Sequence, residues 1–247
     1  MSKIDKLLER MMQRRIEAAV LINDQPARFM VAGHETSGGV LPAAQLYGLV
    51  QEITPPDLWW QLTQDSSFEF AYQSPHGTFV VAIVRAGDSF QVSIAPDFTA
   101  QAHEAQALCN EGIRLGKLVR YEEAISLFDA TTEKYAAAPA PDVQAQVARA
   151  YKSRGAVLHL MGAEQAALAS FEEVLRRFGD STHPAVQRQV AKALLNKAAT
   201  FFHLGQRLKA LAIYNELLGR FENHTHPAVG ALVDEARRAR DALRAAR

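Results

Sequence analysis

The sequence of 247 residues contains a single cysteine, Cys109. One cysteine cannot form an internal disulfide framework, and such sparse use is typical of proteins in a reducing compartment. No apolar run approaches the roughly 20 residues that a membrane-spanning helix needs. Residues 1–6 include an acidic residue and lead into no apolar stretch, so they do not resemble a secretory signal. We therefore expect a cytoplasmic protein with no direct membrane insertion.

Charge of one sign is also not concentrated in this chain. The sequence has 27 Lys and Arg residues against 27 Asp and Glu residues, with a small acidic excess in residues 1–99 and a small basic excess beyond. A protein that binds nucleic acid is expected to carry a dense basic patch, so we expect no nucleic-acid partner. With 48% hydrophobic and 22% charged residues, the composition is that of a globular protein.

Sequence motifs of common enzymes are missing. There is no G-x-S-x-G, H-E-x-x-H or C-x-x-C pattern, and each of these arranges a nucleophile or a metal for chemistry. The stretch from Gly112 to Leu118 is one residue short of a phosphate-binding loop and lacks its magnesium-binding hydroxyl. Residues 33–39 contain glycines but no lysine, and we interpret them as a flexible connection between a strand and a helix.

Cys109 could be paired with His103 or His159 as a nucleophile and base. Its place in the repeat described below puts it on a helix, however, where a small and partly buried residue is ordinary. A catalytic site needs a nucleophile, a base and an orienting group that converge. We therefore expect no enzyme activity, no catalytic residue and no cofactor.

The C-terminal part of the chain repeats at an interval of 43 residues. Several independent columns share this interval, which indicates tandem structural repeats. These columns are Pro141, Pro184 and Pro227; Gly112, Gly155 and Ala198; Ala124, Ala167 and Ala210; Phe128, Phe171 and Tyr214; and Tyr135, Phe178 and Phe221.

Each repeat unit is predicted to form two helices. The first begins at the proline, carries apolar residues at helical spacing and ends near Gly162 or Gly205. The second is amphipathic and ends at a bulky aromatic residue. Because the recurring glycines and alanines have little or no side chain, the paired helices can approach closely, and the aromatic residue fills the groove beside them.

These columns resemble those of the tetratricopeptide repeat, in the long bacterial form that has Arg177-Phe178, Pro184 and Asn196-Lys197-Ala198 at matching positions. A HEAT-type repeat has a compatible period, but the paired small residues favour the tetratricopeptide interpretation. The resemblance covers residues 104–247. It implies about three helical repeats, followed by a capping helix that begins at Pro227.

The phrase Thr-His-Pro-Ala-Val occurs at residues 182–186 and again at residues 225–229. Its histidines could be metal ligands, or the phrase could mark the start of a helix with proline in the first turn. No cysteine or acidic residue recurs with His183, His224 and His226, whereas a zinc site needs several convergent ligands. We therefore interpret the phrase as a helix start, with its threonine and histidine at the cap, and expect no metal site.

Residues 1–99 have a different pattern. Apolar residues at helical spacing predict a helix near the N-terminus, and period-two patterns bounded by turn residues predict strands. The expected order is that helix, strands at 18–22 and 28–32, helices at 43–53 and 56–62, and a meander of strands at 68–72, 77–85 and 89–94.

This order is similar to the small PAS-like N-terminal domain of the twitching-motility (pilus-retraction) secretion ATPases. The resemblance is carried by Ile4-Asp5-Lys-Leu-Leu8, Pro26-Ala-Arg-Phe-Met30, Leu41-Pro42, Phe68-Glu-Phe70 and Gly77-Thr-Phe79. It implies an antiparallel sheet with helices over residues 1–99. Those ATPases continue into a RecA-like motor, whereas here the repeats take its place. The expected fold class is α+β: a small α/β domain followed by an all-α superhelix.

The resemblance to tetratricopeptide proteins implies that the first helices of the repeats line a concave groove that binds a peptide or a partner helix. Basic residues on this face would favour an acidic segment; the alternative is that they are solvated charges on an exposed helix. The candidate partner-binding residues are Lys117, Arg149, Lys152, His159, Arg188, Lys192, Asn196 and His203.

The expected function is non-catalytic protein binding, as an adaptor or scaffold. The repeats would hold a protein or peptide partner, and the N-terminal domain would dock a second partner or another copy of the chain. The adjacent Trp59 and Trp60 cannot both face the core of a helical segment. Either one is exposed and contributes to an interface, or one is buried and the other partly covers the sheet. By resemblance, the second partner would belong to a type IV pilus or a related secretion assembly. The alternative is a regulator whose PAS-like domain senses a nucleotide or metabolite.

Overall fold

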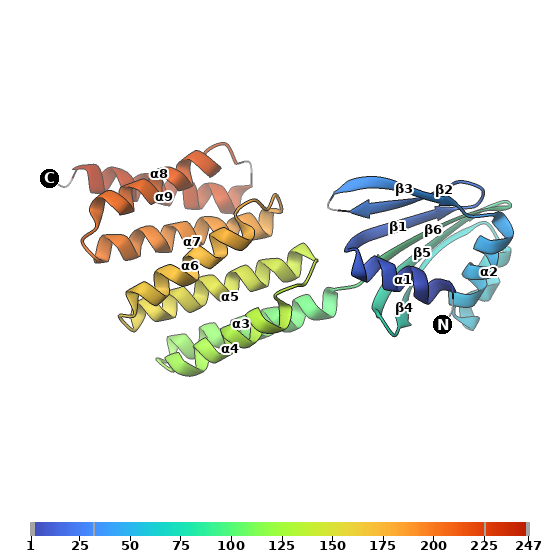
Figure 1. Ribbon diagram of the computed structural model, residues 1–247, viewed down its shortest axis with the longest axis horizontal. Coiled ribbons are helices and arrows are strands. Elements are labelled where there is room, and N and C mark those ends of the chain that lie inside the picture. The colour runs from blue at the N-terminus through green and yellow to red at the C-terminus, as the bar shows by residue number, and fades with distance from the viewer. Residues whose placement is uncertain (1–2, 32, 225, 246–247) are drawn as a thin grey trace. The chain divides into compact units, whose positions relative to one another are not determined.

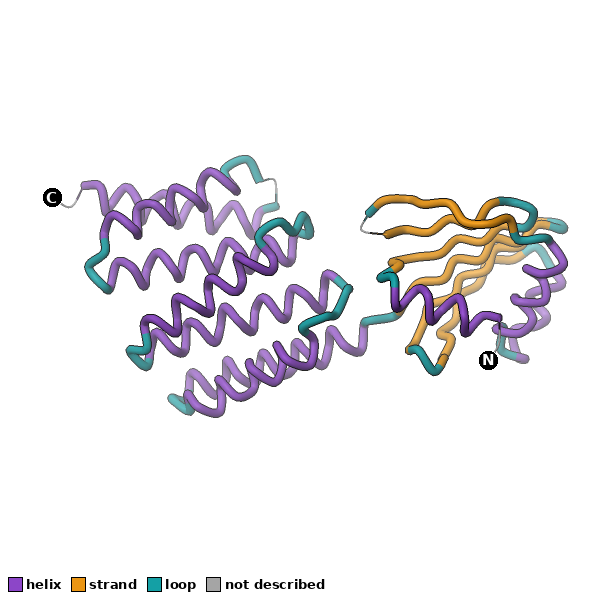
Figure 2. Tube along the Cα trace, in the orientation of Figure 1, coloured by secondary structure: helices purple, strands orange, loops and turns teal. Residues whose placement is uncertain are grey.

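The computed structural model describes residues 3–31, 33–224 and 226–245. The chain divides into two compact units, Met1–Thr99 and Ala100–Arg247. In the described residues, the first unit contains all of the strands and the second is built from helices (Figures 1 and 2). The fold class is therefore α+β, as the sequence predicts. No helix within the described ranges is both long and apolar enough to span a lipid bilayer.

The first unit is built on a six-stranded antiparallel sheet with strand order β3-β2-β1-β6-β5-β4. Its first strand pairs with its last at the centre, so the two halves of the unit form one continuous sheet. The elements are α1 (Lys3–Gln13), β1 (Ile16–Ile22), β2 (Pro26–Val31), β3 (His34–Val40), α2 (Ala43–Ile53), the 3-10 helix η1 (Pro56–Thr63), β4 (Ser66–Ser74), β5 (Gly77–Ala86) and β6 (Ser89–Pro96).

The core of the first unit lies between one face of this sheet and the helices α1 and α2 (Figure 1). Strand β5 alternates buried and less buried residues, which directs Phe79, Val81 and Ile83 into the core. Ile4 and Leu8, one turn apart on α1, are buried in the same cluster. The apolar residues that predict a helix near the N-terminus are therefore the ones that pack against the sheet.

Strand β3 corrects the prediction that residues 33–39 form a flexible connection. Residues 34–39 belong to an edge strand that pairs with β2, with Thr36 opposite Phe29. Six of the seven residues of β3 are exposed, so the strand has no apolar alternation by which a sequence pattern could reveal it. It is held by the backbone ladder, and a Cβ atom on Gly38 would lie 2.6 Å from the Phe29 ring. Ala32, the last residue of the predicted strand 28–32, lies outside the described residues.

The second unit comprises seven helices in its described residues, arranged as antiparallel pairs followed by a last helix. They are α3 (Thr99–Lys117), α4 (Tyr121–Tyr135), α5 (Pro141–Leu160), α6 (Glu164–Phe178), α7 (Pro184–His203), α8 (Arg207–Phe221) and α9 (Pro227–Ala245). The first helices of the pairs are α3, α5 and α7, and the second helices are α4, α6 and α8. The predicted capping helix is α9, and the end of the expected range, residues 246–247, lies outside the described residues.

The 43-residue interval is also present in the backbone. Residues Val119, Gly162 and Gly205 all adopt positive φ angles, of 63°, 74° and 69°. In each case the next residue donates a backbone hydrogen bond to a carbonyl five residues earlier, which is the bond that closes a Schellman-type helix end. The same turn therefore joins the two helices of every pair.

The small columns lie inside the helix pairs. Gly112 faces the ring of Phe128, and Gly155 faces the ring of Phe171. Ala124, Ala167 and Ala210 are fully buried on the second helices. Since a larger side chain at the glycine positions would meet an aromatic ring, these residues set how closely the first and second helices approach.

The repeated phrase lies at helix starts. Pro184 occupies the first turn of α7 after the N-cap residue His183, where the absence of a proline N–H costs nothing. His226 Nδ1 accepts a hydrogen bond from the Ala228 backbone N–H at 3.2 Å, which satisfies a free donor at the start of α9. Thr225 lies outside the described residues. Within the described ranges, no group of three or more His, Cys, Asp and Glu residues is placed to hold a metal ion.

Candidate functional site

All eight candidate partner-binding residues lie on first helices of the second unit. Lys117 is on α3; Arg149, Lys152 and His159 are on α5; and Arg188, Lys192, Asn196 and His203 are on α7. We call the surface that they share the first-helix face.

The structure links these residues through a chain of neighbours on the first-helix face. Lys117 and Lys152 line one cavity, and His159 and Asn196 line another. The rings of His159 and His203 lie 5.1 Å apart. Residues of successive first helices are thus neighbours on this face, whereas its binding role remains a prediction.

Four of these residues form a group that we call the basic cluster: Arg149, Lys152, Arg188 and Lys192. Within the described residues, none of the four has a carboxylate oxygen within 4 Å. Arg149 donates instead to neutral groups, at 2.7 Å to Asn110 Oδ1 and at 3.3 Å to Gln146 Oε1. The cluster thus has no ion-pair partner within 4 Å among the described residues, and the carboxylate that acts on it, Glu235, is more distant and partly offsets the lowering of the Lys192 pKa.

Several other basic residues of this unit form ion pairs within their own helix. On the second helices, Arg176 pairs with Glu173 at 2.5 Å and Arg220 pairs with Glu216 at 3.2 Å. Such i,i+3 and i,i+4 pairs are the usual way in which exposed helical charges are balanced. The four cations of the basic cluster have no such pair, and they lie near enough to one another to affect the pKa values of its two lysines.

The electrostatic effect of the basic cluster is visible in its lysines. Burial, and then the nearby charges of Lys192 and Arg149, lower the pKa of Lys152 to about 8. Burial and the Arg188 charge also lower the pKa of Lys192. Desolvation and like charges both disfavour a protonated amine. A negatively charged group placed here would therefore relieve an unfavourable arrangement.

Cys109 lies beside the basic cluster but is not exposed. Its thiol is fully buried and lies 3.4 Å from the Gln146 carbonyl oxygen. Burial raises the pKa of the Cys109 thiol to about 11, despite the opposing effect of Arg149. The candidate base His159 has its Nδ1 2.6 Å from Glu164 Oε2. Cys109 is therefore a packing residue of the α3–α4–α5 core.

Two cavities open on the first-helix face. One, of about 240 Å³, lies between α3 and α5 and is lined by Ile113, Gly116, Lys117, Phe128, Lys152, Ser153, Ala156, Val157 and Leu160. The other, of about 200 Å³, lies between α5 and α7 and is lined by Ala156, His159, Leu160, Phe171, Asn196, Ala199 and Thr200. Of the Lys and Arg candidates, Lys117 and Lys152 line the first cavity, whereas Arg149, Arg188 and Lys192 line neither. The apolar lining was not predicted. The only sequence feature that could have indicated it is the 43-residue interval of the lining positions.

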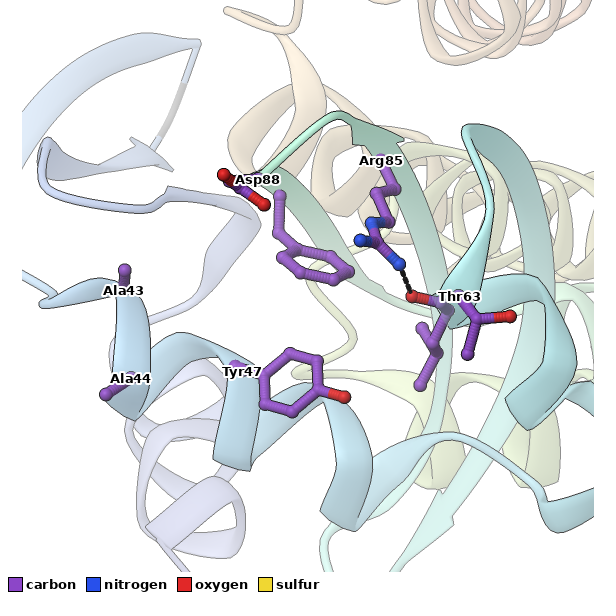
Figure 3. A pocket seen from close by; sticks show the side chains of 8 residues that line it. Ala43, Ala44, Tyr47, Thr63, Arg85 and Asp88 are labelled. Carbon is purple, nitrogen blue, oxygen red and sulfur yellow. Dashed lines mark hydrogen bonds between the residues drawn. The ribbon is translucent and has the colours of Figure 1, made fainter.

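The first unit has a larger cavity, of about 530 Å³, between α2, the end of η1 and the β5–β6 hairpin (Figure 3). Its sides are the rings of Tyr47 and Phe90, whose centroids lie 5.6 Å apart. Arg85 reaches into it, but the guanidinium donates to the Leu62 and Gly87 carbonyl oxygens and lies 5.4 Å from the Phe90 ring centroid. The cavity is thus aromatic, and its cation is already engaged by the protein.

Trp59 and Trp60 are both more exposed than the sequence predicts. Their relative exposures are 52% and 59%, whereas both interpretations of the sequence place one of the two rings against the core. The segment is a 3-10 helix rather than an α-helix, so its side chains project differently. Trp59 Nε1 donates to the Thr54 carbonyl oxygen at 2.8 Å, which fixes one ring against the end of α2.

Comparisons with known proteins give distant similarity only. No protein-family model matches the sequence, and no curated protein matches it. Among solved structures, the pilus retraction motor PilT with bound ADP is similar over 38% of this chain and 29% of its own, at 12% identity and a TM-score of 0.35. The ATPase DotB of Legionella pneumophila is similar over 38% of this chain and 28% of its own, at 16% identity and a TM-score of 0.33. The chain thus spans less than a third of each of these proteins.

Proposed function

We propose that this chain is a non-catalytic adaptor of the tetratricopeptide type, whose first-helix face binds an acidic segment of a partner protein. The observation that carries this proposal is the basic cluster, in which Arg149, Lys152, Arg188 and Lys192 have no carboxylate within 4 Å in the described residues. A carboxylate-rich segment supplies the missing counter-charge, and complementary potentials also accelerate and orient association.

The partly buried lysines strengthen the argument for an acidic ligand. The pKa of Lys152 is lowered to about 8 by burial and by neighbouring cations, so a bound carboxylate would offset the cost of keeping this amine charged. A cation that is only a solvated surface charge gains little from a bound carboxylate, because water already stabilises it. The cluster therefore fits a binding surface better than an incidental set of exposed charges.

The first unit would dock a second partner or another copy of the chain. The exposed Trp59 and Trp60 are the residues best suited to this, since tryptophan is favoured as an interface anchor. The resemblance of residues 1–99 to the N-terminal domain of pilus-retraction ATPases suggests that the second partner belongs to a type IV pilus or secretion assembly.

The test is a charge reversal on α7, with a matched control. Arg188→Glu together with Lys192→Glu reverses half of the basic cluster, whereas Arg176→Glu together with Lys209→Glu makes the same charge change on second helices. Affinity capture with cross-linking of the full chain would be compared between the two double variants. We expect a partner, cross-linked through an acidic segment, that the control retains and the α7 variant loses. Equal recovery by both variants would show that the basic cluster does not bind it.

A second candidate function is ligand sensing through the first unit, and the cavity of about 530 Å³ beside Tyr47 and Phe90 favours it. Aromatic walls with a few polar groups are typical of small-ligand sites. A thermal-shift screen of nucleotides and metabolites, repeated on Tyr47→Ala, tests this function. A ligand that raises the melting temperature of the native chain but not of the variant would support it, and no shift with any compound would count against it.

A further inference from the structure

The two cavities on the first-helix face occupy equivalent positions in two successive repeats. Every residue that lines the cavity between α5 and α7 lies 43 positions after a residue that lines the cavity between α3 and α5. The corresponding pairs are Ile113 and Ala156, Gly116 and His159, Lys117 and Leu160, Phe128 and Phe171, Ser153 and Asn196, Ala156 and Ala199, and Val157 and Thr200.

The cavities share a wall and an apolar base. Ala156 and Leu160 line both of them. The base of each is the fully buried ring of Phe128 or Phe171. Leu160, between the two openings, is 65% exposed. An apolar ligand that enters both cavities would cover this leucine as well.

The polar groups around the first cavity indicate the chemistry of what lies next to the apolar contact. Lys117 and Lys152 border this cavity, and Lys152 connects it to the rest of the basic cluster. Ser153 Oγ is buried and has no hydrogen-bond partner among the described residues. These groups favour a ligand whose apolar side chains are flanked by carboxylates or other acceptors.

We propose that the two cavities receive two apolar side chains of one extended acidic segment, while its carboxylates face the basic cluster. This inference rests on the proposed function and specifies the class of segment that the first-helix face accepts. Axes of packed helices lie about 8–10 Å apart, and an extended chain advances about 3.1–3.4 Å per residue. The two apolar residues should therefore be about three positions apart in the ligand.

The experiment is a selection of random peptides displayed on phage against the full chain, followed by affinity measurements on the peptides that are enriched. We expect acidic peptides with two apolar residues about three positions apart. Alanine in place of either apolar residue should weaken binding about tenfold, since each buries one side chain. Reversal of Arg188 and Lys192 should weaken all of these peptides.

Variants of the protein test the cavities directly. Ala156→Met adds side-chain volume to both cavities, and Leu160→Ser changes the shared wall at an exposed position. Both should remove the advantage of the apolar residues and leave the weaker, charge-driven binding in place. Leu208→Ser is the matched control, because Leu208 is 82% exposed on the second helix α8, and it should bind every peptide as the native chain does.

The outcomes separate this inference from the proposed function. Enriched acidic peptides with no apolar pair, bound equally well by Ala156→Met and Leu160→Ser, would overturn the inference and support the acidic ligand. Enriched apolar peptides without acidic residues would overturn the proposed acidic ligand and with it this inference. Failure to enrich any peptide would overturn both.

Discussion

A Cβ atom on Gly155 would lie 2.5 Å from Cε1 of Phe171. The same relationship occurs one repeat earlier, where a Cβ atom on Gly112 would lie 2.6 Å from Cε1 of Phe128. Both distances are well inside van der Waals contact, and both rings are fully buried. The first and second helices of these pairs can therefore approach this closely only because the first helix carries glycine where the two cross.

Substitution Gly155→Ala tests this close packing. The added methyl group must displace the Phe171 ring in a dense core, which typically costs about 1–3 kcal/mol, more than the up to about 1 kcal/mol that alanine gains by helix propensity. We expect a lower free energy of unfolding in urea. The control is Gly219→Ala in α8, where nothing lies within 4 Å of the added atom and the propensity gain should appear alone. Stabilisation by both changes would show that the pair is not tightly packed.

Val119 is a β-branched residue in a conformation that favours glycine. Its φ is 63°, and Gly162 and Gly205 occupy the same turn in the next two repeats. A left-handed conformation costs an L-residue about 1–2 kcal/mol, and the exposed Val119 side chain has little burial to offset it. We expect Val119→Gly to raise the melting temperature, with a gain of about 1 kcal/mol in stability.

The reverse substitution checks the same explanation. Gly162→Val places a β-branched side chain in the equivalent turn and should destabilise the protein by a similar amount. If Val119→Gly leaves stability unchanged while Gly162→Val lowers it, the first turn is supported by contacts that the other turns lack.

The helical unit could be predicted almost element by element because its signals are local and repeated. Pro141, Pro184 and Pro227 begin helices, and Gly162 and Gly205 form the turns. A proline at the first turn and a glycine after the last act on the backbone whatever surrounds them. The repeats also provide independent evidence for one another, so a residue type that recurs in three repeats predicts the structure more strongly than any single position does.

The parts that could not be predicted depend on neighbours distant in the sequence. Strand β3 (His34–Val40) is an exposed edge strand that pairs with β2, and its residues show no apolar period. The cavities on the first-helix face are lined by residues from helices of successive repeats, and no single segment contains their pattern. The basic residues were identified as candidates, but the absence of carboxylates within 4 Å of them is a property of the packed structure.

Cys109 should be unreactive in the native protein. Its thiol is fully buried, and burial raises its pKa to about 11, so the reactive thiolate is scarce at pH 8. We expect a thiol-specific reagent to modify the native chain at least about a hundredfold more slowly than the chain in denaturant, because modification must wait for local opening. Rapid modification without denaturant would mean that the α3–α5 contact opens readily.

Lys152 should make stability depend on alkaline pH. Its pKa in the folded protein is about 8, against an ordinary value of 10.5, so between these values the unfolded chain binds more protons than the folded chain. By linkage, the free energy of unfolding then rises with pH across this window. Below about pH 8 the amine is charged and held in a partly buried site among other cations, which lowers the free energy of unfolding.

Replacing Lys152 with methionine keeps the unbranched side chain and removes the charge. We expect Lys152→Met to raise the free energy of unfolding by about 2 kcal/mol at pH 7. The difference from the native chain should shrink between pH 8 and 10.5, as the native lysine loses its proton in the folded state. Lys209→Met, at an exposed position of α8, is the matched control for the loss of a lysine charge. Urea unfolding of the three proteins at pH 7, 9 and 10.5 measures these differences in the free energy of unfolding. A difference between Lys152→Met and the native chain that does not change with pH would mean that the Lys152 amine is solvated and its charge is not destabilising. The same variant should weaken the binding of acidic peptides, which would link the cost in stability to the proposed function.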